Sequence, residues 1–330
     1  MKAIVHEHKQ GISGLTYREM DVRTPGAEEV LLKVNVGGLN RRDVAVVENK
    51  HDPESGPFIP GSDASATIEE TGADVKDFQN GEEVIIYPGL GWKEKSDAPP
   101  EGYEIVGFPK DGTFAEYIVM PAENVRKKPD HLTLDESGVL SLAALTAYRV
   151  MFTRGNISEE DTILLPGIGS GVLTYALKFA KAVGARVIVT SRSEDKMKEA
   201  LDIGADRAVF TYDDWNEVLH DETIDVVVES IGGETFQKSI DAVRRGGTIV
   251  TFGATTKDTF ELDIRSFFYG QYNLLGSTMG SMEEWVDMLQ FIEKHGIHPV
   301  VDKMFSAENC QEAFTYIKES KNLGKIGIKF

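Results

Sequence analysis

Cysteine is nearly absent from this sequence, which has one such residue, Cys310, among 330. A single thiol forms no disulfide within the chain and cannot supply a Cys-rich zinc lobe. Cys310 lies at helical spacing from the apolar residues Ala313 and Phe314, a pattern typical of a helix face turned toward a core. We therefore expect a buried structural thiol rather than a reactive one.

Long apolar runs and an excess of basic residues are also missing. No stretch approaches the roughly 18 apolar residues of a membrane span, and the start MKAIVHEHKQ lacks the apolar run of a signal peptide. Fifty-four acidic residues against 35 basic ones give a net charge of −19, which repels nucleic acid and anionic membranes. We expect a cytoplasmic protein with neither as a partner.

The first part of the chain reads as a mainly antiparallel β-domain. Short apolar runs such as Val30–Val36 and Glu83–Tyr87 are separated by Gly, Pro, Asn and Asp. Residues Gly89–Pro109 lack clear periodicity, so we expect a long and partly exposed lobe there. The length of the chain independently favours two domains of about 150 residues each.

From Leu134 onward the pattern changes to helix and then alternates between strand and helix, which predicts a doubly wound parallel sheet of the Rossmann type, an α/β fold. The last 45 or so residues add helices at Met282–His295 and Ala307–Ser320 and a closing strand at Lys325–Phe330. We expect residues 1–127 and 283–330 to form the β-domain and residues 128–282 the Rossmann domain. The expected parallel strands are 162–166, 185–191, 207–210, 224–229, 248–253 and 273–277.

A glycine-rich turn stands between the first of these strands and a helix that ends at Gly184. Such a turn lets backbone N–H groups approach a pyrophosphate at the positive end of a helix. Leu173 departs from the pattern, because the full fingerprint has its third glycine there. The residues predicted to hold the cofactor in this turn are Gly167, Gly169, Ser170, Gly171 and Val172.

Because Ser170 lies between a strand and a helix, an alternative interpretation is the nucleophile elbow of a hydrolase. Gly-x-Ser-x-Gly would require glycine two residues to either side, where the chain has Ile168 and Val172. The spacing therefore does not favour a hydrolase.

The end of the second parallel strand favours NADPH over NADH. An acid about 20 residues beyond the glycines normally binds the free ribose hydroxyl of NADH, whereas this strand ends in Ser191 and Arg192, with Lys196 one turn further on. These side chains suit a 2′-phosphate. Glu194 and Asp195 are counter-evidence, but we interpret them as charges that cap the following helix.

Several segments together resemble a known family over essentially the whole chain. The resemblance is to the zinc-free, quinone oxidoreductase-like branch of the medium-chain dehydrogenase/reductase superfamily, and it implies that the β-domain is GroES-like. The segments are the glycine turn, Gly38-Leu-Asn-Arg-Arg-Asp43, Ile59-Pro-Gly-Ser-Asp63, Asp111-Gly-Thr-Phe-Ala-Glu-Tyr117, Leu145-Thr-Ala-Tyr-Arg149, Gly204-Ala-Asp206 and Leu274-Leu-Gly-Ser-Thr278.

The resemblance also predicts that no metal is bound. Zinc-dependent members hold a catalytic zinc with Cys, His and an acid or second Cys, and the matching positions here are Asn40, the pair Ser62-Asp63, and Leu142. None of these is an ordinary zinc ligand set. The seven histidines are scattered and offer no replacement.

Two catalytic candidates follow from the resemblance. Asn40 is expected to face the nicotinamide in a cleft between the domains, and Thr146 to lie near the carboxamide. The alternative for Asn40 is a turn residue with a locally bonded amide. Tyr87 and His51 could line the mouth of the cleft, and the proton donor stays unassigned.

The remaining cofactor contacts implied by the resemblance lie on later loops of the Rossmann domain. Tyr212 is expected beside the adenine ribose, Ser230 and Gly232 in a loop under the cofactor, and Phe252 and Gly253 near the nicotinamide. Residues 273–279 form an expected sheet edge that members of this family often pair in a homodimer.

Without a metal to polarise a carbonyl, the enzyme must rely on positioned hydride transfer and hydrogen-bond donors. We therefore predict that NADPH reduces a quinone or the β-carbon of an α,β-unsaturated carbonyl, with Asn40 or backbone groups stabilising the developing oxyanion. The alternatives are an alcohol dehydrogenase with an unrecognised metal and a nucleotide-binding sensor without turnover.

Overall fold

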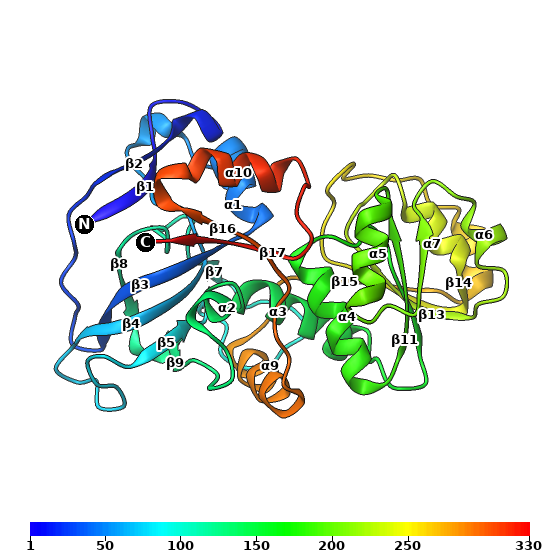
Figure 1. The fold of residues 1–330 in the computed structure, drawn as a ribbon. Coiled ribbons are helices and arrows are strands. Elements are labelled where there is room, and N and C mark those ends of the chain that lie inside the picture. The colour runs from blue at the N-terminus through cyan, green and yellow to red at the C-terminus, as the bar shows by residue number, and fades with distance from the viewer. The chain divides into compact units, whose positions relative to one another are not determined.

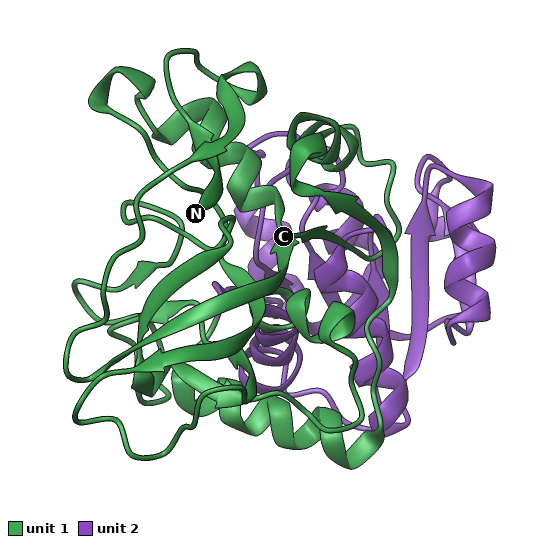
Figure 2. Cartoon of the chain, turned by 60° about the vertical axis from the view of Figure 1, so that its left-hand side comes forward, with its two compact units in different colours: residues 1–143, 280–330 green, residues 144–279 purple.

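The computed structural model describes residues 1–330, which divide into two compact units, residues 1–143 with 280–330 and residues 144–279 (Figure 2). The sequence placed the two boundaries at 127/128 and 282/283. The first boundary lies later because helix α2 (Leu134–Gly138) packs on the β-domain and Leu142 N–H donates to Asp63 in that domain at 2.6 Å. Each unit is described by itself below.

Unit 1 is built on a seven-stranded, mainly antiparallel sheet in the order β16-β17-β3-β4-β5-β9, with β8 pairing on β3 (Figure 1). A β1–β2 hairpin and a short β6–β7 pair complete it. The strands are β1 (Lys2–His6), β2 (Leu15–Glu19), β3 (Glu29–Leu39), β4 (Asp63–Thr71), β5 (Glu83–Ile86), β6 (Gly89–Leu90), β7 (Glu104–Ile105), β8 (Tyr117–Pro121), β9 (Val125–Lys127), β16 (Val301–Ser306) and β17 (Lys325–Lys329).

The carboxyl-terminal residues are part of this unit, because β17 pairs antiparallel with β3, with Gly327 opposite Gly38. Helices α1 (Arg41–Ala45), α9 (Met282–His295) and α10 (Cys310–Lys318) also belong to it. The predicted bounds of α9 are confirmed, and the predicted helix at 307–320 forms as a short 3-10 turn followed by α10. Ser281 and Glu284 form the capping box that begins α9.

The core of unit 1 forms where α10 packs against β2, β16 and β17. Its apolar cluster includes Phe114, Phe314 and Ile326, which are fully buried. Cys310 lies in the same cluster with 3% of its surface exposed, and burial raises the pKa of its thiol. The expectation of a buried structural thiol is confirmed, because an un-ionised thiol in an apolar site is a poor nucleophile.

Unit 2 is a doubly wound parallel sheet, as the sequence predicts. Its strand order is β12-β11-β10-β13-β14-β15, and the order reverses between β10 and β13. The strands are β10 (Thr162–Leu165), β11 (Arg186–Ser191), β12 (Arg207–Phe210), β13 (Ile224–Glu229), β14 (Val243–Thr251) and β15 (Asn273–Gly276). The helices are α3 (Ser141–Tyr148, which crosses the unit boundary), α4 (Gly171–Val183), α5 (Glu194–Asp202), α6 (Trp215–Val218), α7 (Phe236–Ala242) and α8 (Ile264–Gly270).

The strands of unit 2 form where the sequence predicts them, with the largest difference at β14. This strand begins at Val243, five residues before the expected start at 248, and its pairing with β13 is irregular near its beginning. The sequence did not predict the first residues of this strand, because they include Gly246 and Gly247 and glycine weakens a strand pattern. In this structure, no helix has both the length and the apolar character needed to cross a membrane.

Candidate functional site

The glycine turn joins β10 to α4 at the switch point of the sheet. Gly167 has a φ of 75°, and a Cβ there would stand 2.7 Å from Cδ1 of Ile231 in the loop after β13. Its N–H donates to Oγ1 of Thr190 near the end of β11, at 3.1 Å. The turn is therefore held between the ends of two other strands, which leaves no room for a side chain at its first glycine.

The turn delivers the amino end of α4 to the carboxyl edge of the sheet. Ser170 is the N-cap, and its Oγ accepts a hydrogen bond from Leu173 N–H at 3.2 Å. Leu173, at the position of the missing third glycine, is fully buried. A helix of 13 residues that begins here presents the positive end of its dipole and unpaired N–H groups, which is the geometry that binds a phosphate.

Beyond β11 the structure offers a free cation and no acid at the strand end. The side chain of Arg192 is exposed and makes neither a hydrogen bond nor an ion pair, while the Oγ of Ser191 accepts from Ser193 N–H at 3.1 Å. Glu194 and Asp195 stand in the first turn of α5, whose N-cap is Ser193. Their interpretation as capping charges is confirmed, because negative charge there complements the helix dipole. Lys196 follows on the same helix and is partly buried.

The loop after β13 is organised by a carboxylate that sequence reasoning missed. Glu229, the last residue of β13, is fully buried, and its Oε1 accepts from Ile231 N–H at 2.6 Å and Gly232 N–H at 3.2 Å. The hydroxyls of Thr235 and Ser239 donate to the same carboxylate. The signal in the sequence was an acid directly after the apolar run Val226–Val228 and immediately before Ser-Ile-Gly-Gly.

The remaining cofactor candidates lie at the same edge of unit 2. Phe252 N–H donates to the Glu229 carbonyl at 3.2 Å, so Phe252 and Gly253 run beside the loop of Ser230 and Gly232. Tyr212, after β12, is 65% exposed, with its ring centroid 5.6 Å from that of Phe210. Parallel topology thus gathers the predicted cofactor residues at the carboxyl ends of five strands, where α/β sheets bind ligands.

A second polar group is buried in unit 1, around Asn40 at the N-cap of α1. The Oδ1 of Asn40 accepts from the ammonium of Lys325 at 2.6 Å, and its Nδ2 donates to the Gly38 carbonyl at 3.1 Å and to Oδ2 of Asp63 at 3.0 Å. Lys325 also donates to the Leu39 carbonyl at 3.1 Å and to Asp63 at 3.3 Å. The amide of Asn40 is therefore fully bonded within the protein, with 7% of the residue exposed.

Arg42 and Asp43 connect this group to its surroundings. Asn40 N–H donates to Oδ2 of Asp43 at 2.8 Å, and Arg42 donates to Oγ of Ser62 at 2.9 Å. Arg42 also binds the carbonyls of Ile105, Val106 and Phe108, at 3.3, 3.1 and 3.2 Å. Asp43 is fully buried, and burial raises its pKa to about 6, with the charge of Arg42 partly opposing the shift.

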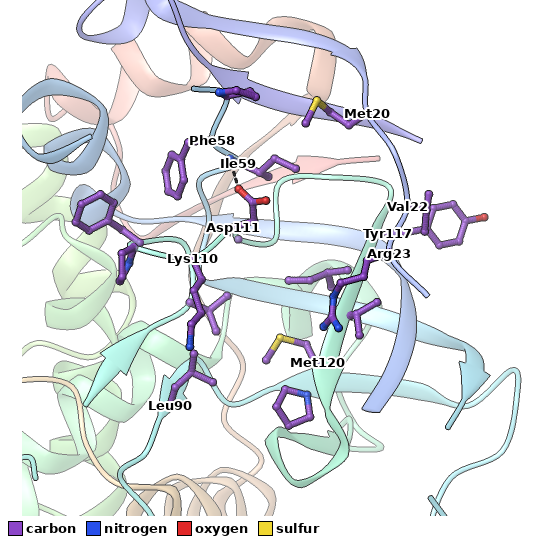
Figure 3. Close-up of a pocket in the computed structure, with 18 of the residues that line it drawn as sticks. Met20, Val22, Arg23, Phe58, Ile59, Leu90, Lys110, Asp111, Tyr117 and Met120 are labelled. Atoms are coloured by element: carbon purple, nitrogen blue, oxygen red, sulfur yellow. Dashed lines mark hydrogen bonds between the residues drawn. The ribbon is translucent and has the colours of Figure 1, made fainter. Parts of the chain in front are cut away.

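A groove of about 1200 Å³ lies on unit 1. Figure 3 shows its wall, where the carboxylate of Asp111 accepts from Ile59 N–H at 2.9 Å and Lys110 lies nearby. Val106 and Phe108 line it too, so Arg42 ties the wall of the groove to the group around Asn40. The lobe at Gly89–Pro109 is partly exposed, as predicted, and part of it forms a wall of the groove.

Three candidates remain to be placed. Tyr87 is fully buried, and its hydroxyl lies 3.0 Å from the Trp92 carbonyl and 2.9 Å from the Gly280 carbonyl, so it does not line a cleft mouth. His51 lines the groove with 7% of its surface exposed, and its Nδ1 lies 2.8 Å from Nδ1 of His6. Thr146, on α3, is 6% exposed and belongs to unit 2.

Comparison with known proteins agrees with both units. Residues 26–130 match the alcohol dehydrogenase GroES-like domain, and residues 171–294 match the zinc-binding dehydrogenase family. A zinc-type alcohol dehydrogenase-like protein of Schizosaccharomyces pombe is 31% identical over 347 aligned positions, covering 100% of this chain and 99% of that protein. The chain belongs to the medium-chain dehydrogenase/reductase superfamily.

Other members of the superfamily are also similar over their full length. An acryloyl-coenzyme A reductase of Sulfurisphaera tokodaii is 28% identical, with 100% of both chains covered. The crystal structure of an NAD-dependent alcohol dehydrogenase has a TM-score of 0.92 and 31% identity, again with 100% of both chains covered. The fold prediction is thereby confirmed, and the chain is a member of a superfamily of nicotinamide-dependent oxidoreductases.

Because the superfamily includes zinc enzymes, we tested whether the residues at the ligand positions suit zinc. They do not. Leu142 has an apolar side chain and its backbone N–H donates to Asp63, while the Oγ of Ser62 donates to the Val106 carbonyl at 2.7 Å. The ammonium of Lys325 lies against Asn40 and Asp63, so a positive charge already stands where a metal would need those donors. The described chain has no group of three or more His, Cys, Asp or Glu suited to a metal.

The raised pKa of Asp43 makes a prediction for stability. Its ordinary pKa is 3.8 and its folded pKa is about 6, so the folded state binds the proton more tightly between these values. The stabilisation this provides is complete below about pH 4 and is lost as the pH rises through about 6. We expect Asp43→Asn to gain in Tm relative to the wild type from about pH 4 to about pH 7, measured by circular dichroism. Exposed Asp77→Asn is the control, and parallel Tm curves for wild type and Asp43→Asn would contradict the assignment.

Proposed function

We propose that this chain is an NADPH-dependent reductase that transfers hydride to a quinone or to the β-carbon of an α,β-unsaturated carbonyl without a metal. The observation that carries the proposal is the buried contact of Lys325 with Asn40 and Asp63 at the ligand positions. A reductase without a Lewis acid works best on an acceptor that is already electron-poor. Quinones and conjugated carbonyls meet that requirement.

The preference for NADPH rests on the end of β11. The unpaired, exposed guanidinium of Arg192 can form a charge-assisted pair with a 2′-phosphate, and no acid at the strand end is available to bind a free ribose hydroxyl. Ser191 and Lys196 add donors nearby, and Tyr212 offers an exposed ring for the adenosine end. The similar NAD-dependent alcohol dehydrogenase makes NADH the alternative to test.

We assign the other end of the cofactor to the loops of Ser230 and Gly232 and of Phe252 and Gly253, with Thr146 at the carboxamide. NADPH, when bound, supplies the hydride. Within unit 2 the buried carboxylate of Glu229 stabilises the first loop, because it accepts the N–H groups that would otherwise be unpaired. The amino end of α4 receives the pyrophosphate.

Asn40 remains our candidate for stabilising the oxyanion, and its contacts define what this role requires. Both amide hydrogens are engaged, one by the Gly38 carbonyl and one by Asp63. To donate to substrate, the amide must share or release one of these acceptors, and the Gly38 carbonyl bond, at 3.1 Å, is the longer. Backbone N–H groups are the alternative donors.

The unsaturated carbonyl is the favoured acceptor. The relative from Sulfurisphaera tokodaii, similar over its full length, is named as a reductase of acryloyl-coenzyme A, a conjugated thioester. The groove on unit 1 has apolar walls at Phe58, Leu90 and Met120, which suit an apolar substrate body. Hydride addition to the β-carbon places negative charge on the carbonyl oxygen, where the donors above stabilise it.

We also propose a homodimer formed through β15. This strand is the edge of the sheet, with β14 as its only neighbour, and Leu274 on it is 36% exposed. Ile264, Phe268 and Tyr269 on the preceding helix are also exposed, at 73, 48 and 59%. An unpaired strand edge beside exposed apolar side chains is a surface that a second copy can cover by strand pairing.

Turnover and metal content test the reaction together. We expect the purified, chelator-treated enzyme to lack stoichiometric zinc. We also expect it to oxidise NADPH in the presence of conjugated ketones, enals, enoyl thioesters or quinones, measured as the loss of NADPH absorbance. Primary alcohols with NADP+ are the matched negative assay. Stoichiometric zinc, or activity that a chelator removes and zinc restores, would identify the alcohol dehydrogenase alternative. Cofactor binding without turnover of any acceptor would identify a sensor.

Charge reversal tests the cofactor assignment. Arg192→Glu should raise the Kd for NADPH about 10- to 100-fold, because a charge-assisted bond is replaced by repulsion, and leave NADH nearly unchanged. Lys198→Glu, an exposed reversal on the same helix α5, is the control. The measurement is fluorescence titration with both nucleotides. Retained selectivity for NADPH in Arg192→Glu would remove the basis of the assignment.

Sedimentation velocity tests the dimer. We expect the wild type to sediment as a dimer and Leu274→Glu to shift toward monomer, because a carboxylate on the edge strand opposes a like charge on its twofold partner. Leu201→Glu alters another exposed leucine, 44% exposed on α5, and should leave the dimer intact. A monomeric wild type, or equal effects of both substitutions, would rule out this interface.

A further inference from the structure

Lys325 is a buried lysine whose three ammonium hydrogens all find acceptors. Its side chain is 3% exposed, and it donates to the Leu39 carbonyl, Oδ1 of Asn40 and Oδ2 of Asp63. The acceptors come from the end of β3, the start of α1 and the start of β4, more than 260 residues earlier in the chain. A buried ammonium is costly unless it is paired and hydrogen-bonded throughout, and this one is.

Asp63 is held as firmly as the lysine. Its side chain is fully buried, and its second oxygen, Oδ1, accepts from Leu142 N–H at 2.6 Å. Its Oδ2 receives both the ammonium of Lys325 and the amide of Asn40. Asn40 therefore lies between a fixed cation at its oxygen and a fixed anion at its nitrogen, so only one orientation of its amide satisfies both neighbours.

This arrangement also polarises the amide. A hydrogen bond from a cation to the oxygen of Asn40 draws electron density from its nitrogen and makes the N–H groups better donors. The donor that would meet an oxyanion is thus strengthened from the opposite end. The same cation neutralises Asp63, whose unpaired charge would otherwise repel an oxyanion.

We infer that Lys325 is a positioning residue whose buried ammonium group orients and polarises the amide of Asn40. The effect of Lys325 on turnover rests on the proposed function, whereas its effect on the orientation of the Asn40 amide does not. Lys325 acts through Asn40 and Asp63 and needs no contact with substrate.

The test removes the ammonium and returns it as a separate molecule. Lys325→Ala leaves a buried gap beside Asn40 and Asp63 that a short alkylammonium ion can fill. We expect kcat to fall by about 10- to 100-fold with the Kd for NADPH within about twofold, because the amide loses its fixed orientation while unit 2 is unchanged. Ethylammonium or propylammonium should restore kcat in a saturable manner and raise the Tm of the variant. Propan-1-ol, of similar shape and no charge, should not restore kcat.

Two further variants separate positioning from folding. Lys329→Ala removes another lysine of β17, whose ion pair with Asp135 is half-exposed, and should change neither kcat nor the response to alkylammonium. Lys325→Arg keeps the charge and should retain more turnover than Lys325→Ala at equal folded fraction. If alkylammonium raises the Tm of Lys325→Ala but leaves kcat low, Lys325 is only structural and the inference is overturned.

If the wild type turns over no acceptor, the proposed function is wrong. The role of Lys325 is then tested by a measurement that does not need turnover. The side-chain amide resonance of Asn40, assigned with Asn40→Ser, should shift in Lys325→Ala and return on addition of ethylammonium. An unchanged amide signal in Lys325→Ala would overturn the inference whatever the activity.

Discussion

The buried ion pair between Lys325 and Asp63 is the interaction on which the polar site of unit 1 depends. The ammonium comes from β17, and its acceptors come from β3, β4 and the start of α1, so one group joins four elements. Charges this deep are tolerated only when each is bonded, and here Asn40, Leu39 and Leu142 complete the bonding. The positive charge beside Asn40 is therefore a side chain of the protein, the ammonium group of Lys325.

In the proposed function, unit 2 has the opposite problem, because it must bind an anionic cofactor although the chain has a net charge of −19. The groups that we assign to this task are the amino end of α4 and Arg192, both at the carboxyl edge of the sheet. The carboxylate of Glu229 lies at the same edge, but it accepts hydrogen bonds from four donor groups of the following loop and of α7. The proposal therefore relies on a local helix dipole and one exposed cation to attract an anion where the overall electrostatic field is unfavourable.

The two units differ in how well the sequence predicted them. Apolar strands separated by amphipathic helices predicted the parallel sheet closely, since each element has a local signal. The sequence also predicted which loops lie together at one edge of the sheet, because parallel topology places the carboxyl end of every strand there; their role in cofactor binding stays a prediction. Unit 1 gave weaker signals: its strands pair across long separations, and the lobe at 89–109 became a groove wall only through the bonds of Arg42 to its carbonyls.

By itself the sequence determined the fold class, the glycine turn and the absence of an acid at the last residue of β11, and its resemblance to a family implied that Asn40, Ser62, Asp63 and Leu142 stand at zinc-ligand positions. These are properties of residue type at fixed spacing, and spacing is visible in one dimension. Only the tertiary structure showed that Lys325 contacts two of these positions, Asn40 and Asp63. Lysine is normally a surface residue, so nothing local marks Lys325 as buried. Its partners are brought to it by the pairing of β17 with β3, which joins segments almost 300 residues apart.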